Sequence, residues 1–360
     1  MAVMRGAVFA VLLFSIPALA ADHPTLRVFT VSELEQTLTE ARAGHRSDLE
    51  IAQELDSIEL SERLTDTEFV RLQALLDPNS QSATALQLVA DQSIFFKPSP
   101  NELTDTSVPD SKARMQILTA TVDYVSKLFS TLPNLLATRT TTSYSNISEG
   151  RKKGETIVSA DLHKIKTISL ETSIRNDEID VSNKDPRLKH RKEDMNSRGE
   201  FGALLAVILS DTRSGKVFWN YWEPSLTGKL AVFGFEVPKS ASHYTFDDAH
   251  RIDHPAYHGS LWIEPASGAV DRLFLEVEPD AEMSVHFGTM VQYGPVKIDD
   301  KTFLCPVRSV AIEKAAAFRD DLMRSAPSQP LGKWLNETTF TNYHRFASTA
   351  QIITAPNQPK

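Results

Sequence analysis

The chain has 360 residues, of which 41% are hydrophobic and 24% are charged, and its formal net charge is −9. With a pI near 5.6 it lacks the basic excess of a nucleic-acid-binding face, so we expect no nucleic-acid partner. The single cysteine, Cys305, excludes an internal disulfide, and the length favours two domains with hydrophobic cores of their own.

The N-terminus is typical of a secretory signal peptide. Arg5 precedes the apolar run "GAVFAVLLFSIPAL", and residues 18–20, Ala-Leu-Ala, form a small-residue cleavage motif. The run is too short to span a membrane, and no later segment is long and apolar enough to do so. We therefore expect residues 1–20 to be removed and the rest to be exported to the periplasm or the medium. An uncleaved anchor or a buried core helix is the alternative.

Residues 21–133 are predicted to form a helical domain. Hydrophobic residues recur at helical spacing, and three capping boxes mark helix starts, because a hydroxyl can accept from the first turn while a Glu reaches back. The last helix, which Pro133 ends, is expected to bury one face. The boxes are Ser32 with Glu35, Ser47 with Glu50 and Thr65 with Glu68; the buried face comprises Met115, Leu118, Val122, Val125 and Phe129.

From about residue 135 the hydrophobic pattern changes to alternation, which indicates β-strands. Residues 134–356 are therefore predicted to form an antiparallel β domain whose strands follow one another through short turns. In "EPASGAV", 264–270, Pro265 and a left-handed Gly268 favour a tight hairpin. Residues 182–199 are almost wholly polar, which predicts a mobile loop, whereas the apolar segment 202–210 is either a helix or a buried strand.

Four segments resemble a group of uncharacterised secreted bacterial proteins and together span most of the chain: "TVDYVSKLFSTLPNLLATRTTT", "GEFGALLAVI", "YHGSLWIEPASGAVDRLFLEVE" and "YGPVKIDDKTFLCPVRS". The hairpin from Trp262 to Arg272 is also similar to the W-I-[DE]-P-x-[ST]-G-x-[VL]-x-R hairpin of periplasmic lipoprotein carriers and related envelope sensors. That resemblance implies an antiparallel half-barrel with helices over its concave face, which binds acyl chains or lipoproteins and has no catalytic residues.

The predicted fold class is therefore α+β. We expect an N-terminal helical domain followed by an antiparallel half-barrel-like β-sheet with a covering helix. A sheet with an apolar face requires such a cover, because exposed apolar area is unfavourable in water. The cover is the 202–210 segment, the N-terminal helices or a ligand.

Residues 242–259, "SHYTFDDAHRIDHPAYHG", raise the question of a metal site. His250, His254 and His258 recur every four residues, and with Asp247 they would supply a reasonable zinc ligand set on a helix. Pro255 opposes that helix, because it lacks an N–H donor and restricts the preceding residue to extended geometry. We favour a polar loop that leads into the next strand, with the metal set as the second hypothesis.

The chain lacks the usual catalytic motifs. It contains no G-x-S-x-G elbow, Walker A loop, G-x-G-x-x-G fingerprint or H-E-x-x-H pair. Cys305 alternates with Phe303 and Val307, which favours a buried core position over a nucleophile. We therefore favour a non-enzymatic protein and expect no cofactor.

Aromatic residues fall on successive predicted strands, and they form either ordinary core or an apolar pocket between sheet and helices. We hypothesise an exported envelope protein that binds an apolar or amphiphilic ligand, a lipid or a lipoprotein, through them. One alternative is a scaffold whose helical half binds an envelope protein. The other is a metal-dependent hydrolase that uses the His/Asp stretch 243–258. The aromatic residues are Trp219, Tyr221, Phe233, Phe235, Trp262 and Phe287.

Overall fold

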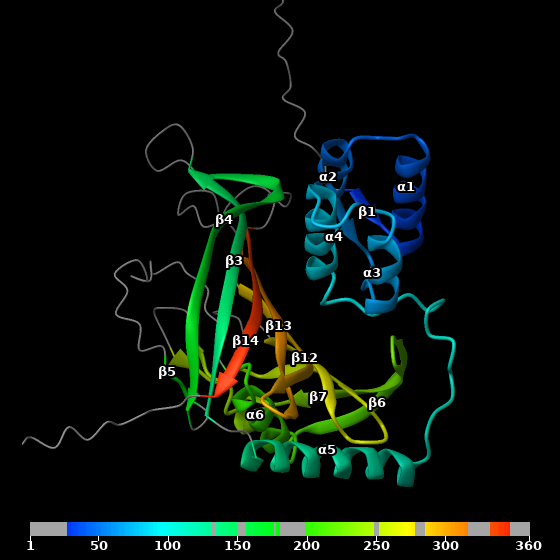
Figure 1. Ribbon diagram of the computed structural model, residues 1–360. Helices are drawn as coiled ribbons and strands as arrows, with labels where there is room; N and C mark the ends of the chain where they lie inside the picture. Colours follow the sequence, from blue (N-terminus) through cyan, green and yellow to red (C-terminus); the bar gives the residue numbers. More distant parts are fainter. Residues whose placement is uncertain are drawn as a thin grey trace, which may run out of the picture.

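The computed structural model describes residues 27–131, 134–149, 156–175, 178–180, 199–247, 252–277, 285–315 and 332–345. The predicted signal segment 1–20 lies outside them, and so does the predicted loop 182–199 apart from Gly199. Within the described residues, a helical unit precedes a ten-stranded antiparallel sheet whose two edges do not meet (Figure 1). The predicted α+β fold with a half-barrel-like sheet is confirmed.

The N-terminal helical unit, residues 27–96, packs four helices around its own apolar core. Leu34, Leu38, Leu72 and Leu86 are fully buried at its centre. The first strand pairs in parallel with the second across the intervening helices. The elements are β1 (Arg27–Phe29), α1 (Val31–Ala43), α2 (Asp48–Asp56), β2 (Ile58–Leu60), α3 (Asp66–Gln73) and α4 (Gln81–Gln92).

Capping chemistry fixes the helix starts of this unit. At α2 the Ser47 N–H donates to the Glu50 carboxylate at 2.8 Å and the Ser47 hydroxyl accepts from Glu50 N–H, which confirms the predicted box. At α3 half of the predicted box is present: the Thr65 hydroxyl accepts from the Glu68 N–H, whereas the Glu68 carboxylate accepts from Arg71. The first predicted box, at 32 and 35, is wrong: α1 begins after Thr30, which forms a capping box with Glu33. The helix starts two residues earlier because its first residue is already part of the apolar core.

The large sheet has the strand order β5-β4-β3-β14-β13-β12-β11-β10-β7-β6, so β6 is one of its edges. Every neighbouring pair is antiparallel, as the succession of strands predicts. The strands are β3 (Leu135–Glu149), β4 (Thr156–Arg175), β5 (Glu178–Asp180), β6 (Lys216–Ser225), β7 (Gly228–Val237), β10 (Tyr257–Ile263), β11 (Val270–Val277), β12 (Val285–Ile298), β13 (Lys301–Ala315) and β14 (Gly332–Arg345). A separate ribbon pairs β8 (Phe246–Asp247) with β9 (Ile252–Asp253).

Two helices cover one face of this sheet, α5 (Ser111–Thr131) and α6 (Ala203–Asp211). Segment 202–210 is thus a helix and not a buried strand. Ile117 and Val125 of α5 and Ile208 of α6 share one apolar cluster with β7, β10, β11 and β12. Figure 1 shows both helices on the same side of the molecule, away from the helical unit. None of the described helices is long and apolar enough to cross a membrane.

The buried face of α5 differs from the predicted one. Ile117, Thr121 and Val125 are buried, whereas Met115 is 63% exposed and Val122 41% exposed. At roughly 100° per residue, Met115 and Val122 lie about 140–160° around the helix from Ile117, so they face away from the sheet. The predicted stripe is therefore wrong at Met115 and Val122 and confirmed at Val125, while Leu118 packs partly on the cluster and the side chain of Phe129 lies outside the described ones.

The hairpin between β10 and β11 is held against α5. Gly268 has the predicted left-handed backbone, with φ of 76°, and its N–H donates to the Glu264 carbonyl at 2.9 Å. A Cβ at Gly268 would overlap the backbone of α5 at Ala120 and Thr121. Glycine is therefore required at this turn both for its backbone conformation and for the close approach of the helix.

The helical unit packs on the other face of the sheet. Leu88 and Ile94 of the unit belong to one buried cluster with Trp262 and Met290, and Phe95 packs against it. Because side chains alternate across a strand, Leu261 and Ile263 face α5 and α6 while Trp262 faces the helical unit. The central strands are therefore covered on both faces by parts of the same chain.

Candidate functional site

The candidate ligand site is the apolar layer, which we define as the side chains of β6, β7 and β10–β12 that face α5 and α6. It contains aromatic rings in edge-to-face contact, with Trp219 4.8 Å from Trp222 and 5.4 Å from Phe233 between ring centroids. Phe235 and Phe287 are buried in the same layer. Four of the six aromatic residues singled out in the sequence, Trp219, Phe233, Phe235 and Phe287, are therefore brought together.

The other two residues of that set, Tyr221 and Trp262, lie on the opposite face, with the helical unit. In β6 the register shifts between Trp219 and Tyr221, and this bulge places residues that should share a face on opposite faces. Trp262 pairs with Val232, one residue out of phase with Phe233. The structure therefore does not bring all six into one pocket, and the ligand-binding role of the set stays a prediction.

Two buried polar atoms in the apolar layer have no hydrogen-bond partner among the described residues: Trp222 Nε1 and Tyr293 Oη. Trp222 is 8% exposed and Tyr293 5%, and burial raises the pKa of the Tyr293 hydroxyl, so that hydroxyl is a neutral donor. Both lie near the end of the layer where the β10–β11 hairpin turns. Trp222 belongs to a row of residues paired across β6, β7, β10 and β11, and that row ends at Val270, the first residue of β11. Tyr293 directly follows Gln292, which pairs with Arg272 near the start of β11. An unsatisfied buried donor costs about 1–3 kcal/mol, so two in one layer require a reason.

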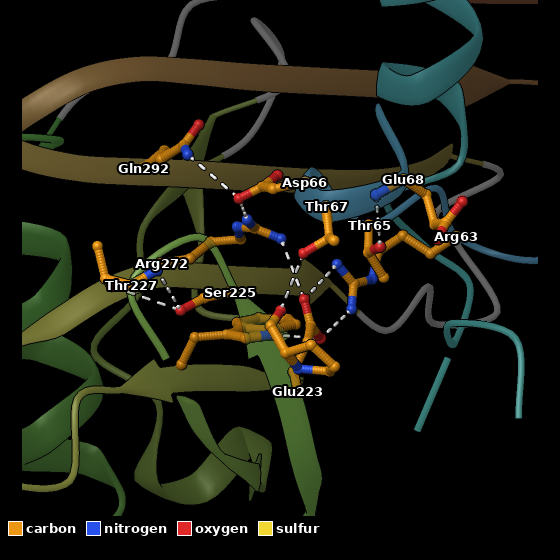
Figure 2. A network of polar contacts seen from close by, with 12 residues as sticks. Arg63, Thr65, Asp66, Thr67, Glu68, Glu223, Ser225, Thr227, Arg272 and Gln292 are labelled. Carbon is orange, nitrogen blue, oxygen red and sulfur yellow. Dashed lines mark hydrogen bonds and ion pairs between the residues drawn. The ribbon is translucent and has the colours of Figure 1, made fainter. Parts of the chain in front are cut away.

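A buried polar network fills the interface between the helical unit and the opposite face (Figure 2). Arg63, which precedes α3, forms a two-pronged ion pair with Glu223 of β6, with 3.3 Å between Nη1 and Oε1. Trp262 Nε1 donates to Glu223 Oε2 at 2.7 Å, and the Arg63 guanidinium lies 5.0 Å from the Trp262 ring centroid. Arg272 of β11 reaches Glu223 at 3.8 Å and also pairs with Asp66 of α3.

Glu223 is 2% exposed and ionised at the centre of this network. Burial alone raises the pKa of Glu223, but the guanidinium groups of Arg63 and Arg272 outweigh it, and the pKa lies below its ordinary value. Both guanidinium groups are committed to carboxylates of the chain itself. The network is therefore suited to hold two parts of the molecule together, and it presents no group poised for proton transfer.

Further ion pairs join the same two surfaces. Asp91 of α4 accepts from Arg308 of β13 with both carboxylate oxygens at 2.6 Å, and Arg308 also reaches Glu337 of β14 at 3.0 Å. Lys333 of β14 pairs with Glu59 of β2. The sequence analysis singled out none of these residues. The sequence feature that could have indicated such pairs is a charged residue within the apolar alternation of a strand, such as Arg272 after the hairpin.

The histidine side chains of residues 242–259 contact different partners. Residues 254–256 are irregular and lead into β10, where His258 Nε2 lies 3.3 Å from a Glu276 carboxylate oxygen. His254 Nδ1 lies 3.0 Å from the Tyr244 carbonyl. Among the described residues no three His, Cys, Asp or Glu side chains are placed to hold a metal, and Asp247 lies on β8. His250 lies outside the described residues, so the predicted metal set remains untested.

Cys305 is buried in a small cluster with Phe201 and Phe340. Burial raises the pKa of its thiol to about 12. The thiolate is the reactive form of cysteine, so a thiol in this environment does not act as a nucleophile near neutral pH.

Comparison with known proteins finds no matching family model and no match among curated proteins. Among solved structures, the chain is similar to the crystal structure of LolA superfamily protein NE2245 from Nitrosomonas europaea. The two are 7% identical, the match covers 66% of this chain and 97% of that one, and the TM-score is 0.28. The function of this chain is therefore inferred from its own residues.

Proposed function

We propose that this protein is an exported, non-enzymatic binding protein for an amphiphilic ligand, a lipid or the lipid-modified part of a lipoprotein, which enters the apolar layer when α5 moves. The observation that carries the proposal is a pair of donors without a hydrogen-bond partner among the described residues, Trp222 Nε1 and Tyr293 Oη, within a buried aromatic layer. Export is proposed from the signal-like segment 1–20.

The limited packing of α5 on the apolar layer supports the proposal that a ligand can displace this helix. Among the described side chains of α5, only Ile117, Thr121 and Val125 are buried, and Leu118 and Tyr124 pack partly on the layer. Full burial of an aliphatic side chain contributes about 1.5–3 kcal/mol, so α5 is held by several kcal/mol. A ligand that buries a comparable apolar area can offset the displacement of this helix.

The chemistry of the layer favours an amphiphile over a pure hydrocarbon. The rings of Phe233, Phe235 and Phe287 offer apolar contact to an acyl chain. The indole N–H of Trp222 and the hydroxyl of Tyr293 donate hydrogen bonds, so they suit an ester, carboxylate or phosphate oxygen. Such a ligand removes two unsatisfied donors on binding, which a hydrocarbon cannot do.

Native mass spectrometry of the full chain, purified without detergent from a cell envelope, tests the proposal. We expect a mass above that of the polypeptide and release of the excess mass, as a lipid, by organic extraction. A variant with Phe235→Asp, which places a charge in the layer, should lose the adduct, while Ile252→Asp on an exposed residue should keep it. A protein that carries no adduct and takes up no added phospholipid or fatty acid would contradict the proposal.

A further inference from the structure

One end of the apolar layer is closed by a short segment that belongs to neither covering helix. At the end opposite the β10–β11 hairpin, Tyr257 of β10 pairs with Val237 of β7 and with Val277 of β11. Residues 242–246, which we call the strap, come between β7 and β10 in the chain and end on the separate β8–β9 ribbon. We call this end of the layer the strap end.

Two aromatic side chains of the strap pack on the strap end of the layer. The centroid of the Phe246 ring lies 5.5 Å from that of Phe287, and the centroid of the Tyr244 ring lies 5.7 Å from that of Tyr257. Both strap residues are partly buried against the same apolar cluster as the layer. Their rings therefore occupy the space beyond the last apolar residues of the strands.

A buried carboxylate holds the strap in place. Asp211, the last residue of α6, has a fully buried side chain that accepts from the His243 N–H and from the Tyr257 hydroxyl, each at 2.8 Å. His243 Nδ1 lies 2.6 Å from the other oxygen of this carboxylate. Moving the strap would deprive a buried carboxylate of its donors, which is costly. In contrast, α5 meets the layer through apolar side chains such as Ile117 and Val125, so it is the cover more easily displaced.

The buried donors indicate the direction of a ligand in the layer. Trp222 Nε1 and Tyr293 Oη, which have no hydrogen-bond partner among the described residues, lie near the hairpin end. The strap contributes one such group, the Ser242 hydroxyl. Two donors against one favour a polar head group at the hairpin end, with the acyl chain running along the strands towards the strap.

The length of the layer is comparable to that of one acyl chain. The seven residues of β10, Tyr257–Ile263, span about 20 Å at about 3.3 Å per step. The hydrocarbon core of a bilayer is about 30 Å thick, so one leaflet of acyl chains occupies about 15 Å. An acyl chain of ordinary membrane length therefore fits between the hairpin end and the strap, whereas a much longer chain meets the rings of Tyr244 and Phe246.

We propose that Tyr244 and Phe246 form the closed end of the ligand site and set the longest acyl chain that it accepts. This inference rests on the proposed function, because it requires that an amphiphile enters the apolar layer. It adds a selectivity that the proposed function does not require: chains that end short of the strap bind, and chains that extend past it are excluded.

Competition binding to the full chain measures this selectivity. A bound fluorescent fatty acid is displaced by saturated fatty acids from laurate to behenate, each delivered from cyclodextrin. While the chain lies inside the layer, we expect the affinity to rise by about fourfold per methylene group. Beyond stearate the chain has to displace packed rings, so behenate should bind about tenfold or more weakly than palmitate.

Variants of the strap should move this limit. Phe246→Ala and Tyr244→Ala should each raise the affinity for behenate by about tenfold or more and leave that for laurate unchanged, because laurate ends short of the strap. Phe246→Trp should move the limit the other way and exclude stearate. Ile252→Ala is the matched control, because Ile252 lies on the same ribbon and is 69% exposed, and it should behave as the wild type does. Unchanged laurate binding shows that a variant is folded.

A fatty acid with a diazirine at its methyl end checks the direction of the chain. We expect label on the peptide that contains Tyr244 and Phe246, and label on the Trp222 peptide instead would overturn the inference. It is also overturned if wild-type affinity keeps rising to behenate, or if the strap variants bind laurate normally and keep the wild-type limit. In each of these cases ligand binding in the layer stands. If no fatty acid binds, the proposed function and this inference both fail.

Discussion

Single residues contribute unequally to the stability of this molecule, and Glu223 is an example of a residue on which several contacts depend. It is 2% exposed and is the common partner of Arg63, Trp262 and Arg272, which come from the helical unit and from two strands. A buried carboxylate between two guanidinium groups contributes little net stability over an apolar alternative, but its removal leaves uncompensated buried charge.

We expect Glu223→Gln to lower the free energy of unfolding by about 3–5 kcal/mol, because the buried guanidinium group of Arg63 loses its counter-ion and that of Arg272 keeps only Asp66. Glu236→Gln, at an exposed pair with Lys216, should cost about 0–1 kcal/mol. Urea unfolding followed by tryptophan fluorescence measures both. Equal losses for the two variants would show that the buried network is not what joins the two surfaces.

Glu102 makes a prediction about pH. Its folded-state pKa of about 7 lies above the ordinary value of 4.5, so ionisation in the folded protein is unfavourable. The penalty is absent below about pH 4.5, grows as the pH rises to about 7 and is complete above it. Relative to Glu102→Gln, the wild type should therefore lose stability between about pH 5 and about pH 8. Parallel stability curves for the two proteins would contradict the raised pKa.

Tyr293→Phe separates the ligand-binding role of this hydroxyl from a structural one. Removing a buried hydroxyl that has no partner in the described part of the chain should leave the ligand-free protein as stable as the wild type or more stable, by up to about 1 kcal/mol. Affinity for a fluorescent fatty acid should fall by a few-fold to about tenfold, since one hydrogen bond is lost. A loss of stability in the ligand-free variant would mean that the hydroxyl already has a structural partner.

At the scale of elements, local chemistry predicts much and packing decides the rest. The capping box at Ser47, the cap at Thr65 and the hairpin at Gly268 were all predictable, because each depends on residues within one turn. The buried face of α5 was not, because Met115 and Ile117 are both apolar and only the position of the sheet selects between them. The bulge beside Trp219 likewise leaves no mark in a single sequence.

The contact between the hairpin and α5 makes a prediction with a matched control. A Cβ at Gly268 would overlap the α5 backbone, whereas one at Gly228 would meet nothing within 4 Å although its φ is also positive, at 145°. Gly228→Ala should therefore cost only backbone strain, about 1–3 kcal/mol. Gly268→Ala should cost more and should loosen α5, so it alone should increase the binding of a fluorescent amphiphile to the apolar layer. Equal amphiphile binding by the two variants would exclude α5 as the cover.

At the scale of the whole molecule, the order of a helical unit followed by an antiparallel sheet was predictable from the change of period near residue 135. The assignment of faces was not, because it depends on pairs such as Arg63–Glu223 and Asp91–Arg308 that are far apart in the sequence. Four of the six predicted aromatic residues meet in the apolar layer, while Tyr221 and Trp262 belong to the interface with the helical unit.

Photo-crosslinking tests the central proposal most directly. The full chain is labelled with a fatty acid that carries a diazirine on its acyl chain, and the labelled peptides are mapped by mass spectrometry. We expect saturable label on α5 and on strands of the apolar layer, including the peptide with Phe287 and Tyr293, and loss of label when unlabelled fatty acid competes. Label confined to the helical unit, or label that no competitor displaces, would contradict ligand binding in the apolar layer.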